Sequence, residues 1–423
     1  MKILYISQYF PPEMGAPAAR VSELSGHWAE AGHEVTVLTG FPNHPDGVVR
    51  PEYRRRFRRG VCREQWSGVN VVRTWLLPFP NRKPYERILN YSSFCASAAI
   101  TGSFLSQPDV IIATSPQLLV GLSGYLISRF KRVPFVLEVR DLWPESLAGA
   151  GVGGRTSTLY REIDRLAKFL YRKADHIAVV TPAFRENLIQ VRKMSPSKIS
   201  VVPNGVETQT FAPQLPDSEL HASLGAEGKF LVSYIGTLGL AHGLETLVEC
   251  AERLQATSPE IVFVLLGEGA DRERILALAE SKKLTNLRFV PQQPREKIPA
   301  YIATSDLCLV MLRDSEVFET VIPTKMLEFM ACAKPVVLTA RGQAKAVLES
   351  AGAGVAVPPA NGGELCRAIV QLRQQPALRE QMGRAGRGYI VQNLSRCATA
   401  HHYLEVLSGI LQANSEARIT AAA

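Results

Sequence analysis

Short apolar runs separated by longer amphipathic segments recur through the first half of this 423-residue chain. The strand-like runs lie at residues 3–7, 35–39, 69–75, 110–114, 135–139 and 177–181. Between the first two, Val21, Leu24 and Trp28 recur at helical spacing, and Gly32 suits the left-handed residue that ends a helix. Such alternation is typical of βαβ units, in which helices cover a parallel sheet. The chain is therefore predicted to be an α/β protein.

The same alternation restarts after a polar, proline-containing stretch at residues 203–228. The new runs lie at residues 230–235, 261–266, 287–290, 307–312 and 335–339. Because one hydrophobic core rarely grows beyond roughly 250–300 residues, the chain length also favours two domains. We predict two doubly wound domains, 1–203 and 204–390, facing each other across a cleft at the carboxyl ends of their strands.

Glycines at 386 and 388 separate the second domain from one more helical pattern. We expect a C-terminal helix within residues 391–412, with the N-terminal domain as a packing surface for it. Residues 413–423 are expected to form a disordered tail.

Several chemical classes are disfavoured by what the sequence lacks. The seven cysteines are scattered and form no C-x-x-C pair, which argues against a disulfide framework or a zinc site and favours a reducing cytosol. The phosphate-loop, H-E-x-x-H and G-x-S-x-G patterns are absent. Residues 149–154 match G-x-G-x-x-G but begin eight positions after Asp141, so a flexible loop is favoured over dinucleotide binding. The apolar residues after Lys2 form too short a run for a leader and indicate a first buried strand.

Positive charge is concentrated in the first half of the chain. Residues 1–202 contain 27 Lys and Arg against 16 Asp and Glu, whereas residues 203–423 contain 21 against 23. The run Arg54–Arg59 and the basic residues near 82–87 stand close to a largely apolar segment, 88–105, which has too many polar residues to span a membrane. Basic and apolar elements together favour an anionic membrane surface, although a solvated loop would have the same composition. The basic segments contain neither interleaved aromatic residues that could stack on bases nor a known nucleic-acid-binding motif, so nucleic acid is disfavoured as the partner.

Two segments of the first half place chemistry-bearing residues where strands end. Gly15 follows the first strand, where it allows close approach of a ligand and where the next helix offers N–H groups to an anion; a tight turn would look similar. Arg140, Asp141 and Glu145 follow the strand 135–139, at the edge of the sheet where α/β active sites lie. A local Arg–Asp ion pair is the alternative for the first two.

In the second half, Lys325 and Glu328 are predicted on one face of a helix that begins at Pro323 or Thr324. A lysine beside helix N–H groups neutralises a diphosphate, and a carboxylate one turn later accepts hydrogen bonds from ribose hydroxyls. An ordinary surface pair would have the same spacing. Residues 236–239 and 267–269 supply two further glycine-containing strand ends.

As a set, these segments resemble glycosyltransferase family 4, enzymes of the GT-B fold, over nearly the whole chain. The matching segments are Tyr9–Gly15, Thr114–Pro116, Arg140–Ser146, Val202–Val206, Tyr234–Thr237, Gly267–Gly269 and Pro323–Glu328. The resemblance is to bacterial enzymes that add amino- or deoxysugars to lipid-linked oligosaccharides of O-antigen, capsule or exopolysaccharide. It implies a nucleotide-sugar donor, UDP-linked in our expectation, in the C-terminal domain and an acceptor in the N-terminal domain. It also implies transfer with retention of configuration, without a metal or other cofactor.

The family pattern also shows where this chain departs from its relatives. Glu328 matches the second carboxylate of the family's E-x7-E element, but position 320, where the first is expected, is Thr320, with Glu319 one residue early. Many relatives carry an Arg and a Lys where this chain has Thr237 and His242, so Lys325 is expected to contact the diphosphate. A frequent catalytic-loop histidine is replaced by Arg140.

The predicted site residues follow from the motifs and the resemblance together. They are Asp141, Arg140 and Lys325 for catalysis; Gly15, Gly236, Thr237, His242, Gly267, Glu268, Glu319, Thr324, Lys325 and Glu328 for the donor; and Ser115 and Glu145 for the acceptor. The partners are the donor, a lipid-linked saccharide and an anionic membrane contacted through Arg54–Arg59 and residues 82–105 at the inner face of the cytoplasmic membrane. The alternatives are a non-hydrolysing nucleotide-sugar epimerase and a non-catalytic subunit of a polysaccharide-assembly complex.

Overall fold

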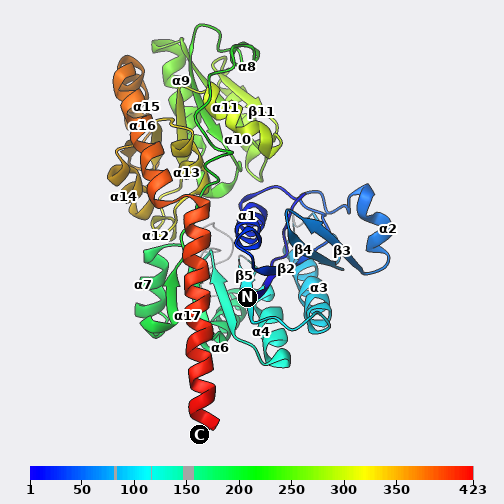
Figure 1. Ribbon diagram of the computed structural model, residues 1–423. Coiled ribbons are helices and arrows are strands. Elements are labelled where there is room, and N and C mark those ends of the chain that lie inside the picture. Colours follow the sequence, from blue (N-terminus) through cyan, green and yellow to red (C-terminus); the bar gives the residue numbers. More distant parts are fainter. Residues whose placement is uncertain (81–82, 116, 146–156, 423) are drawn as a thin grey trace. The chain divides into compact units, whose positions relative to one another are not determined.

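The computed structural model describes residues 1–80, 83–115, 117–145 and 157–422, which form two compact units (Figure 1). Among these residues, unit 1 comprises 1–145, 157–204 and 396–422, and unit 2 comprises 205–395. The sequence-based boundary at 203/204 lies one residue from the observed division. The glycine-rich segment 149–154 lies outside the described residues.

Unit 1 contains an eight-stranded sheet in the order β3-β4-β2-β1-β5-β6-β7-β8, in which β3 alone is antiparallel to its neighbour. Its elements are β1 (Lys2–Ile6), α1 (Ala16–Glu30), β2 (Glu34–Gly40), α2 (Arg54–Phe57), β3 (Val61–Trp66), β4 (Val69–Thr74), α3 (Pro84–Ser103), β5 (Val110–Thr114), α4 (Leu118–Lys131), β6 (Phe135–Val139), α6 (Thr158–Lys173), β7 (His176–Val179), α7 (Pro182–Gln190), β8 (Ile199–Val201) and α17 (Arg396–Ala422). Strand β1 lies at the centre, with Ile3 paired to Val35 of β2 and to Val110 of β5. Because the sheet is parallel, the carboxyl ends of β1, β5 and β6 lie along one edge.

Helix α17 returns to unit 1 and packs on α1 (Figure 1). Trp28 of α1 donates an indole hydrogen bond to the Ala400 carbonyl at 3.0 Å and meets the Tyr403 ring edge-on. Arg396 pairs with Glu23 at 2.9 Å. The expectation of a disordered tail at 413–423 is corrected, because α17 continues to Ala422 through an alanine-rich segment without glycine or proline.

Unit 2 contains a six-stranded, all-parallel sheet in the order β11-β10-β9-β12-β13-β14. Its elements are α8 (Ser218–Ser223), β9 (Phe230–Ile235), α9 (Glu245–Thr257), β10 (Ile261–Leu266), α10 (Arg272–Ser281), β11 (Leu287–Val290), α11 (Ile298–Thr304), β12 (Leu307–Met311), α12 (Glu316–Glu319), α13 (Thr324–Ala331), β13 (Val336–Thr339), α14 (Gly342–Ala351), β14 (Gly354–Val357), α15 (Gly362–Gln374) and α16 (Pro376–Asn393). Alternate residues of β9 enter two separate buried clusters, one with α13 and the other with α9 and α15. Both units are thus doubly wound, as predicted.

Within the described ranges, we find no helix that combines the length and the apolar character needed to cross a bilayer. The segment expected to be a poor spanning helix forms most of α3, whose Asn90, Ser93 and Ser97 make hydrogen bonds inside unit 1.

Candidate functional site

Two glycine loops of unit 2 pack backbone against backbone where β9 and β10 end. Gly236 and Gly267 have positive φ angles of 141° and 148°. A Cβ atom on Gly267 would lie 2.0 Å from the Gly236 carbonyl oxygen, and one on Gly269 would lie 2.3 Å from the Leu238 carbonyl oxygen. No side chain fits at these two positions, so the sequence here is dictated by the close approach of the loops. This close approach fixes the loops beside Lys325.

Lys325 lies in the first turn of α13 and is held directly beside these loops. Its Nζ donates a 2.6 Å hydrogen bond to the Tyr234 hydroxyl and lies 4.0 Å from the centroid of that ring. The same hydroxyl donates to the Thr237 carbonyl at 2.7 Å. A Cβ on Gly236 would come within 2.8 Å of the lysine Nζ, so the glycine leaves the space that the ammonium group occupies. The first N–H groups of a helix also lack intrahelical acceptors, which makes this end of α13 electropositive.

Burial lowers the pKa of Lys325 to about 7, although the Glu328 carboxylate acts in the opposite direction. Without a bound anion, the ammonium group is therefore close to its midpoint at neutral pH. A diphosphate at the end of α13 would favour the charged form and draw a proton onto the lysine.

This pKa predicts how donor affinity depends on pH. A nucleotide-sugar, whose diphosphate diester has no proton to lose near neutrality, should bind more weakly as the pH rises above about 7, because Lys325 must then take up a proton on binding. The slope should approach a tenfold weakening per pH unit. Isothermal titration calorimetry from pH 6 to 9 in two buffers of different ionisation enthalpy measures both the slope and the proton uptake. Lys325→Met should abolish the slope, and a slope that persists in this variant would assign it to another group.

Glu328, one turn after Lys325, is paired with an arginine that the sequence motifs did not indicate. Its Oε1 lies 3.1 Å from Arg295 Nη1, and the Arg295 guanidinium lies over the Phe211 ring. Glu328 as a residue is only 9% exposed. Arg295 and Tyr234 are the two residues of this region that sequence analysis missed. The polar Tyr234 within an otherwise mostly aliphatic strand was the only available signal for either.

His242, the weaker candidate for the diphosphate, is held in an uncharged form. Its Nδ1 lies 3.1 Å from the Met311 carbonyl oxygen, which can only accept, so Nδ1 carries the proton. Burial, and then the neighbouring Lys325, lower the pKa of His242 to about 3. The imidazole therefore adds no positive charge at neutral pH. Thr237 contributes its carbonyl to the tyrosine, and its side chain is exposed.

The remaining donor-binding candidates lie on neighbouring elements. Glu268 is exposed and lies 3.5 Å from Arg272. Thr324 begins α13. Glu319 ends α12, and its carbonyl oxygen would lie 2.0 Å from a Cβ on Gly342. Thr320, where the family pattern has a carboxylate, donates its hydroxyl to the Val317 carbonyl.

Unit 1 brings three predicted residues together at the carboxyl ends of β1, β5 and β6. Gly15, with a φ angle of 128°, precedes α1, and the Arg140 Nη2 donates to the carbonyl of the next residue, Ala16, at 3.2 Å. The Arg140 backbone N–H donates to Ser115 Oγ at 2.7 Å. Ser115 thus orders the backbone of the loop that carries Arg140.

Among the residues that the structure describes, two buried nitrogens of the Arg140 guanidinium, Nε and Nη1, have no hydrogen-bond partner. Burial and the nearby Arg20 lower its pKa, although Glu138 opposes this. Burial raises the pKa of Asp141 to about 6, and Arg140 acts against the shift. The loop after β6 therefore combines a cation with unused donors and a carboxyl group that titrates near neutrality.

Glu145, predicted to contact the acceptor, is held away from this group. Its Oε1 accepts from Arg192 Nη2 at 2.6 Å, and Arg192 also pairs with Asp164 of α6. This contact ties the loop after β6 to α6 and to the segment after α7.

A further carboxyl group, Glu13, lies buried in the loop between β1 and α1. Its Oε1 accepts from the backbone N–H groups of Asn43 and His44 at 2.9 and 3.0 Å, while Oε2 finds no hydrogen-bond partner within the described part of the chain. Burial raises the pKa of Glu13 to about 7. Sequence analysis assigned no role to this residue, although a carboxylate directly after two prolines was a visible signal.

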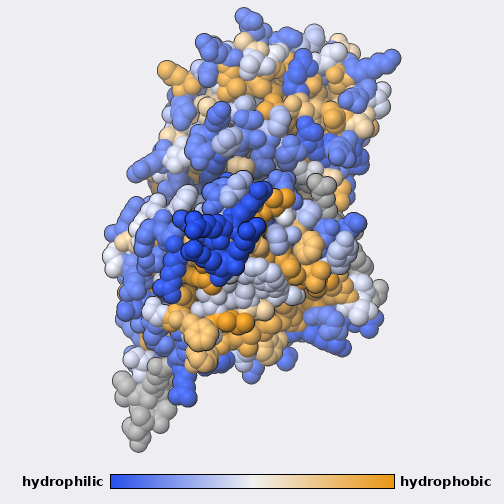
Figure 2. All heavy atoms as spheres, turned by 90° about the vertical axis from the view of Figure 1, so that its right-hand side faces the viewer, coloured by the Kyte–Doolittle hydropathy of each residue, from blue (hydrophilic) through white to orange (hydrophobic). Residues whose placement is uncertain are grey.

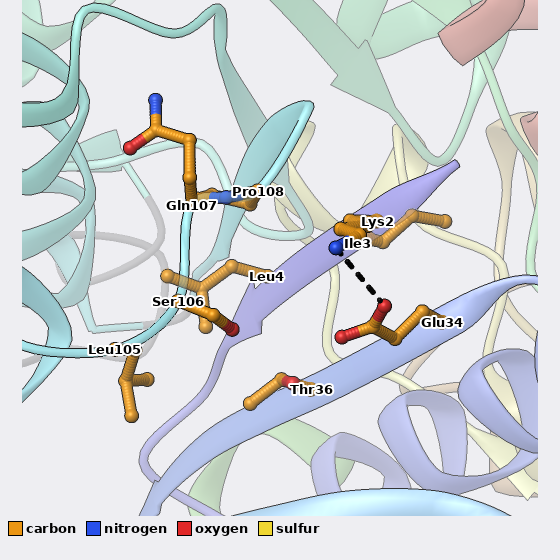
Figure 3. Close-up of a pocket in the computed structure, with 9 residues that line it drawn as sticks. All are labelled: Lys2, Ile3, Leu4, Glu34, Thr36, Leu105, Ser106, Gln107 and Pro108. Atoms are coloured by element: carbon orange, nitrogen blue, oxygen red, sulfur yellow. Dashed lines mark ion pairs between the residues drawn. The ribbon is translucent and has the colours of Figure 1, made fainter.

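A shallow hollow of unit 1 lies at the opposite end of the sheet from these loops (Figure 3). It is lined by the amino ends of β1 and β2 and by residues 105–108, and the Lys2–Glu34 ion pair of 3.5 Å crosses one side of it. It contains none of the predicted site residues.

Two family models match the chain, and together they cover both units. The glycosyl transferase 4-like domain matches residues 15–205, and the glycosyl transferases group 1 domain matches residues 217–389. WcaI of Escherichia coli K12, a glycosyl transferase assigned to colanic acid biosynthesis, is 24% identical over 80% of this chain and 83% of its own length. The 2-deoxystreptamine N-acetyl-D-glucosaminyltransferase of Streptomyces fradiae is 25% identical over 87% of each chain.

Solved structures share the fold over nearly the whole chain. Sucrose-phosphate synthase of Thermosynechococcus elongatus superposes with a TM-score of 0.77 at 20% identity, covering 97% of this chain and 99% of its own. HepE of Anabaena, crystallised with UDP and glucose, gives a TM-score of 0.73 at 18% identity over 97% of this chain and 100% of its own. Two parallel-sheet units and the two matching domain models lead to one conclusion: the chain belongs to glycosyltransferase family 4 and has the GT-B fold.

Proposed function

We propose that this glycosyltransferase moves a sugar, an amino- or deoxysugar in our expectation, from a UDP-linked donor to a lipid-diphosphate-linked saccharide of a bacterial surface polysaccharide. The observation that carries the proposal is the placement of Lys325 against the glycine loop after β9 and at the start of α13. Its relatives include WcaI, assigned to colanic acid biosynthesis. HepE, which shares the fold, was crystallised with UDP.

In this proposal, unit 2 binds the donor. The diphosphate lies against Lys325 and the N–H groups that begin α13, where positive charge meets the leaving group. The Glu328 carboxylate, kept in place by Arg295, accepts hydrogen bonds from the ribose. No metal is invoked, since the lysine and the helix supply the stabilising charge.

Unit 1 binds the acceptor in the same proposal. The unused Nε and Nη1 of Arg140 contact an anionic oxygen of a substrate, and Asp141 orients the acceptor hydroxyl. The hydroxyl attacks from the face that the leaving group occupies, so that the configuration at the anomeric carbon is retained.

The test begins with binding. A thermal-shift screen of nucleoside diphosphates should show the largest rise in Tm with UDP, because a ligand stabilises the folded state that binds it. A panel of UDP-sugars is then incubated with a lipid-diphosphate saccharide, and the product anomer is assigned by nuclear magnetic resonance. An inverted product would contradict retention. Conversion of the donor without any acceptor would identify an epimerase, and failure to bind any nucleotide would overturn the donor assignment.

Helix α3 supports the membrane part of the proposal because it exposes apolar side chains while several of its polar groups are turned inward. Asn90 donates to the Leu77 carbonyl at 2.7 Å, and Ser93 accepts from the Leu77 N–H at 2.8 Å, so these polar groups are turned inward. Ile88 and Ile100, by contrast, are 52% and 64% exposed, and Phe104 after the helix is 84% exposed. Figure 2 shows a strongly hydrophilic cluster beside apolar surface on the face that carries α2. Exposed arginines of α2 next to such an apolar surface fit an anionic bilayer.

Replacing Arg54, Arg55, Arg58 and Arg59 by glutamine should release the protein from anionic vesicles. At about 1 kcal/mol for each basic residue near the headgroups, partitioning should weaken by up to roughly a thousandfold. Flotation with vesicles of phosphatidylglycerol measures the effect. The matched control replaces the same number of basic residues on unit 2, namely Lys345, Arg367, Arg373 and Arg384. If both sets partition alike, the arginine run is not the membrane contact.

A further inference from the structure

Two cysteine sulfurs meet inside unit 2, between α9 and α15. Cys250 of α9 and Cys366 of α15 are 116 residues apart in sequence, yet their Sγ atoms lie 2.7 Å apart. This is closer than the van der Waals contact of two sulfur atoms and less than about 1 Å longer than a disulfide bond. No other thiol pair among the described residues is recorded at such a distance.

The close approach is built into the two helices. Helix α15 begins at Gly362, where a Cβ atom would already lie 3.3 Å from Glu249 Oε2 of α9. The side chain of Asn361 caps the helix by accepting from the Glu364 N–H at 3.0 Å. Gly362 and the Asn361 cap therefore position the start of α15 against α9 independently of the two cysteines.

We propose that Cys250 and Cys366 form a reversible intramolecular disulfide that links α9 to α15. The two thiols differ in access, since Cys250 is fully buried and Cys366 is 8% exposed. Cys366 is thus the more exposed of the two cysteines and is the one assigned the first reaction with a small disulfide.

The oxidant is a low-molecular-weight disulfide such as oxidised glutathione. The Cys366 thiolate attacks one sulfur of this disulfide, which forms a mixed disulfide and releases the first glutathione thiolate. The Cys250 thiolate then attacks Cys366 Sγ, which forms the protein disulfide and releases the second glutathione. Two protein thiols lose two protons and two electrons, and the glutathione disulfide takes up both and leaves as two molecules of reduced glutathione.

The local electrostatics also favour Cys366 for the first attack and Cys250 for resolving the mixed disulfide. The hydrogen bond between the thiols lowers the pKa of Cys366 and raises the pKa of Cys250, and Arg253 further favours the Cys366 thiolate. The more exposed of the two cysteines is therefore also the better first nucleophile.

The short distance has two measurable consequences. Because the sulfurs need to move by less than about 1 Å, the loops that hold Lys325 should keep their positions, and UDP affinity should change less than threefold on oxidation. Because the bond closes a long chain segment, the oxidised protein should unfold at a higher temperature.

The experiment incubates the full-length protein with oxidised glutathione, blocks free thiols with N-ethylmaleimide under denaturing conditions, and maps the digest by mass spectrometry. The expected result is a peptide pair joined through Cys250 and Cys366, a rise in Tm and reversal of both by dithiothreitol. Cys366→Ser should lose the linked peptides and the rise in Tm. The matched control is Cys397→Ser, which removes the exposed cysteine and should retain both effects.

Two outcomes would overturn the proposal. In the first, both cysteines are recovered as alkylated thiols after prolonged oxidation. In the second, Cys366 is recovered only as its glutathione adduct, which would show that Cys250 does not resolve the mixed disulfide. Because the peptide map is read on the wild-type protein, neither result depends on the folding of a variant, and neither depends on nucleotide binding.

Discussion

Lys325→Ala should lower the turnover of sugar transfer by about 10²–10³ while leaving the fold of unit 2 intact. The lysine Nζ is fixed by the Tyr234 hydroxyl at 2.6 Å and lies beside Gly236, so once donor binding has protonated it, the ammonium group is in place before the leaving diphosphate develops its charge. A donor placed in advance stabilises the transition state without rearrangement, which is why its removal affects turnover more than binding. Substituting the lysine also removes a buried cation, so the stability of unit 2 should not fall.

The measurement is steady-state transfer with the donor and acceptor identified by the panel above. Lys345→Ala is the matched control, because Lys345 lies in the same unit but makes only an exposed i, i+4 ion pair with Glu349. Tyr234→Phe provides a second, graded variant: it keeps the lysine charge but removes its hydrogen bond, and a smaller loss is expected. Unchanged turnover and nucleotide affinity in Lys325→Ala would show that the leaving group is stabilised elsewhere.

Sequence analysis predicted five strands with their observed bounds, namely the interior strands β5, β6, β9 and β10 and the edge strand β11. Strands β5, β6, β9 and β10 match residue for residue because every side chain of each is buried, which makes the apolar run continuous. The three missed strands, β3, β8 and β14, all lie at sheet edges. Edge strands are short or carry exposed polar residues, and in β14 a glycine must let the β13 backbone approach. Their signal is therefore weak in any single sequence.

For the site, the residues that could be predicted are those whose relation is local in sequence. Lys325 and Glu328 could be placed on one helix because their spacing is local. Their partners Tyr234 and Arg295 lie 91 and 33 residues away, and only the folded chain brings them together. Glu145 was grouped with Arg140 because of sequence proximity, but a distant residue, Arg192, holds its carboxylate. Pairing between remote charges has no local pattern from which it could be predicted.

A second large effect is expected from an ion pair that lies beneath the loop of Arg140. Glu138 of β6 and Arg20 of α1 are 0% and 1% exposed, and two nitrogens of Arg20 donate to Glu138 Oε1 at 3.1 and 2.8 Å. Tyr5 donates to the other oxygen at 2.7 Å. Arg20 also donates to the carbonyls of Val202 and Pro203, so the pair joins the first helix to the end of the last strand.

Glu138→Leu should therefore destabilise unit 1 by about 3–5 kcal/mol, because it leaves a buried guanidinium without its counter-charge. The double variant Arg20→Leu/Glu138→Leu removes both charges and should be more stable than Glu138→Leu alone. Urea unfolding followed by tryptophan fluorescence reports on unit 1 specifically, since all four tryptophans of the chain, at 28, 66, 75 and 143, belong to it. A double variant that equals the sum of the two single losses would show that the pair contributes no coupling.

The pair should also make unit 1 sensitive to acid. Burial alone would raise the pKa of Glu138, but Arg20 and Arg140 bring it below the usual value for a glutamate. Because the folded-state pKa is lower than the unfolded one, the stabilisation is present above the unfolded value and is lost as the pH falls through the folded value. Over this acidic range, the free energy of unfolding of unit 1, measured by tryptophan fluorescence, should fall in the wild-type protein. It should fall less in the double variant. Since Glu138 of β6 stands two residues before Arg140, which begins the loop after this strand, the same acid transition should release the loop that carries Arg140 and Asp141. Activity should then fall together with the fluorescence signal.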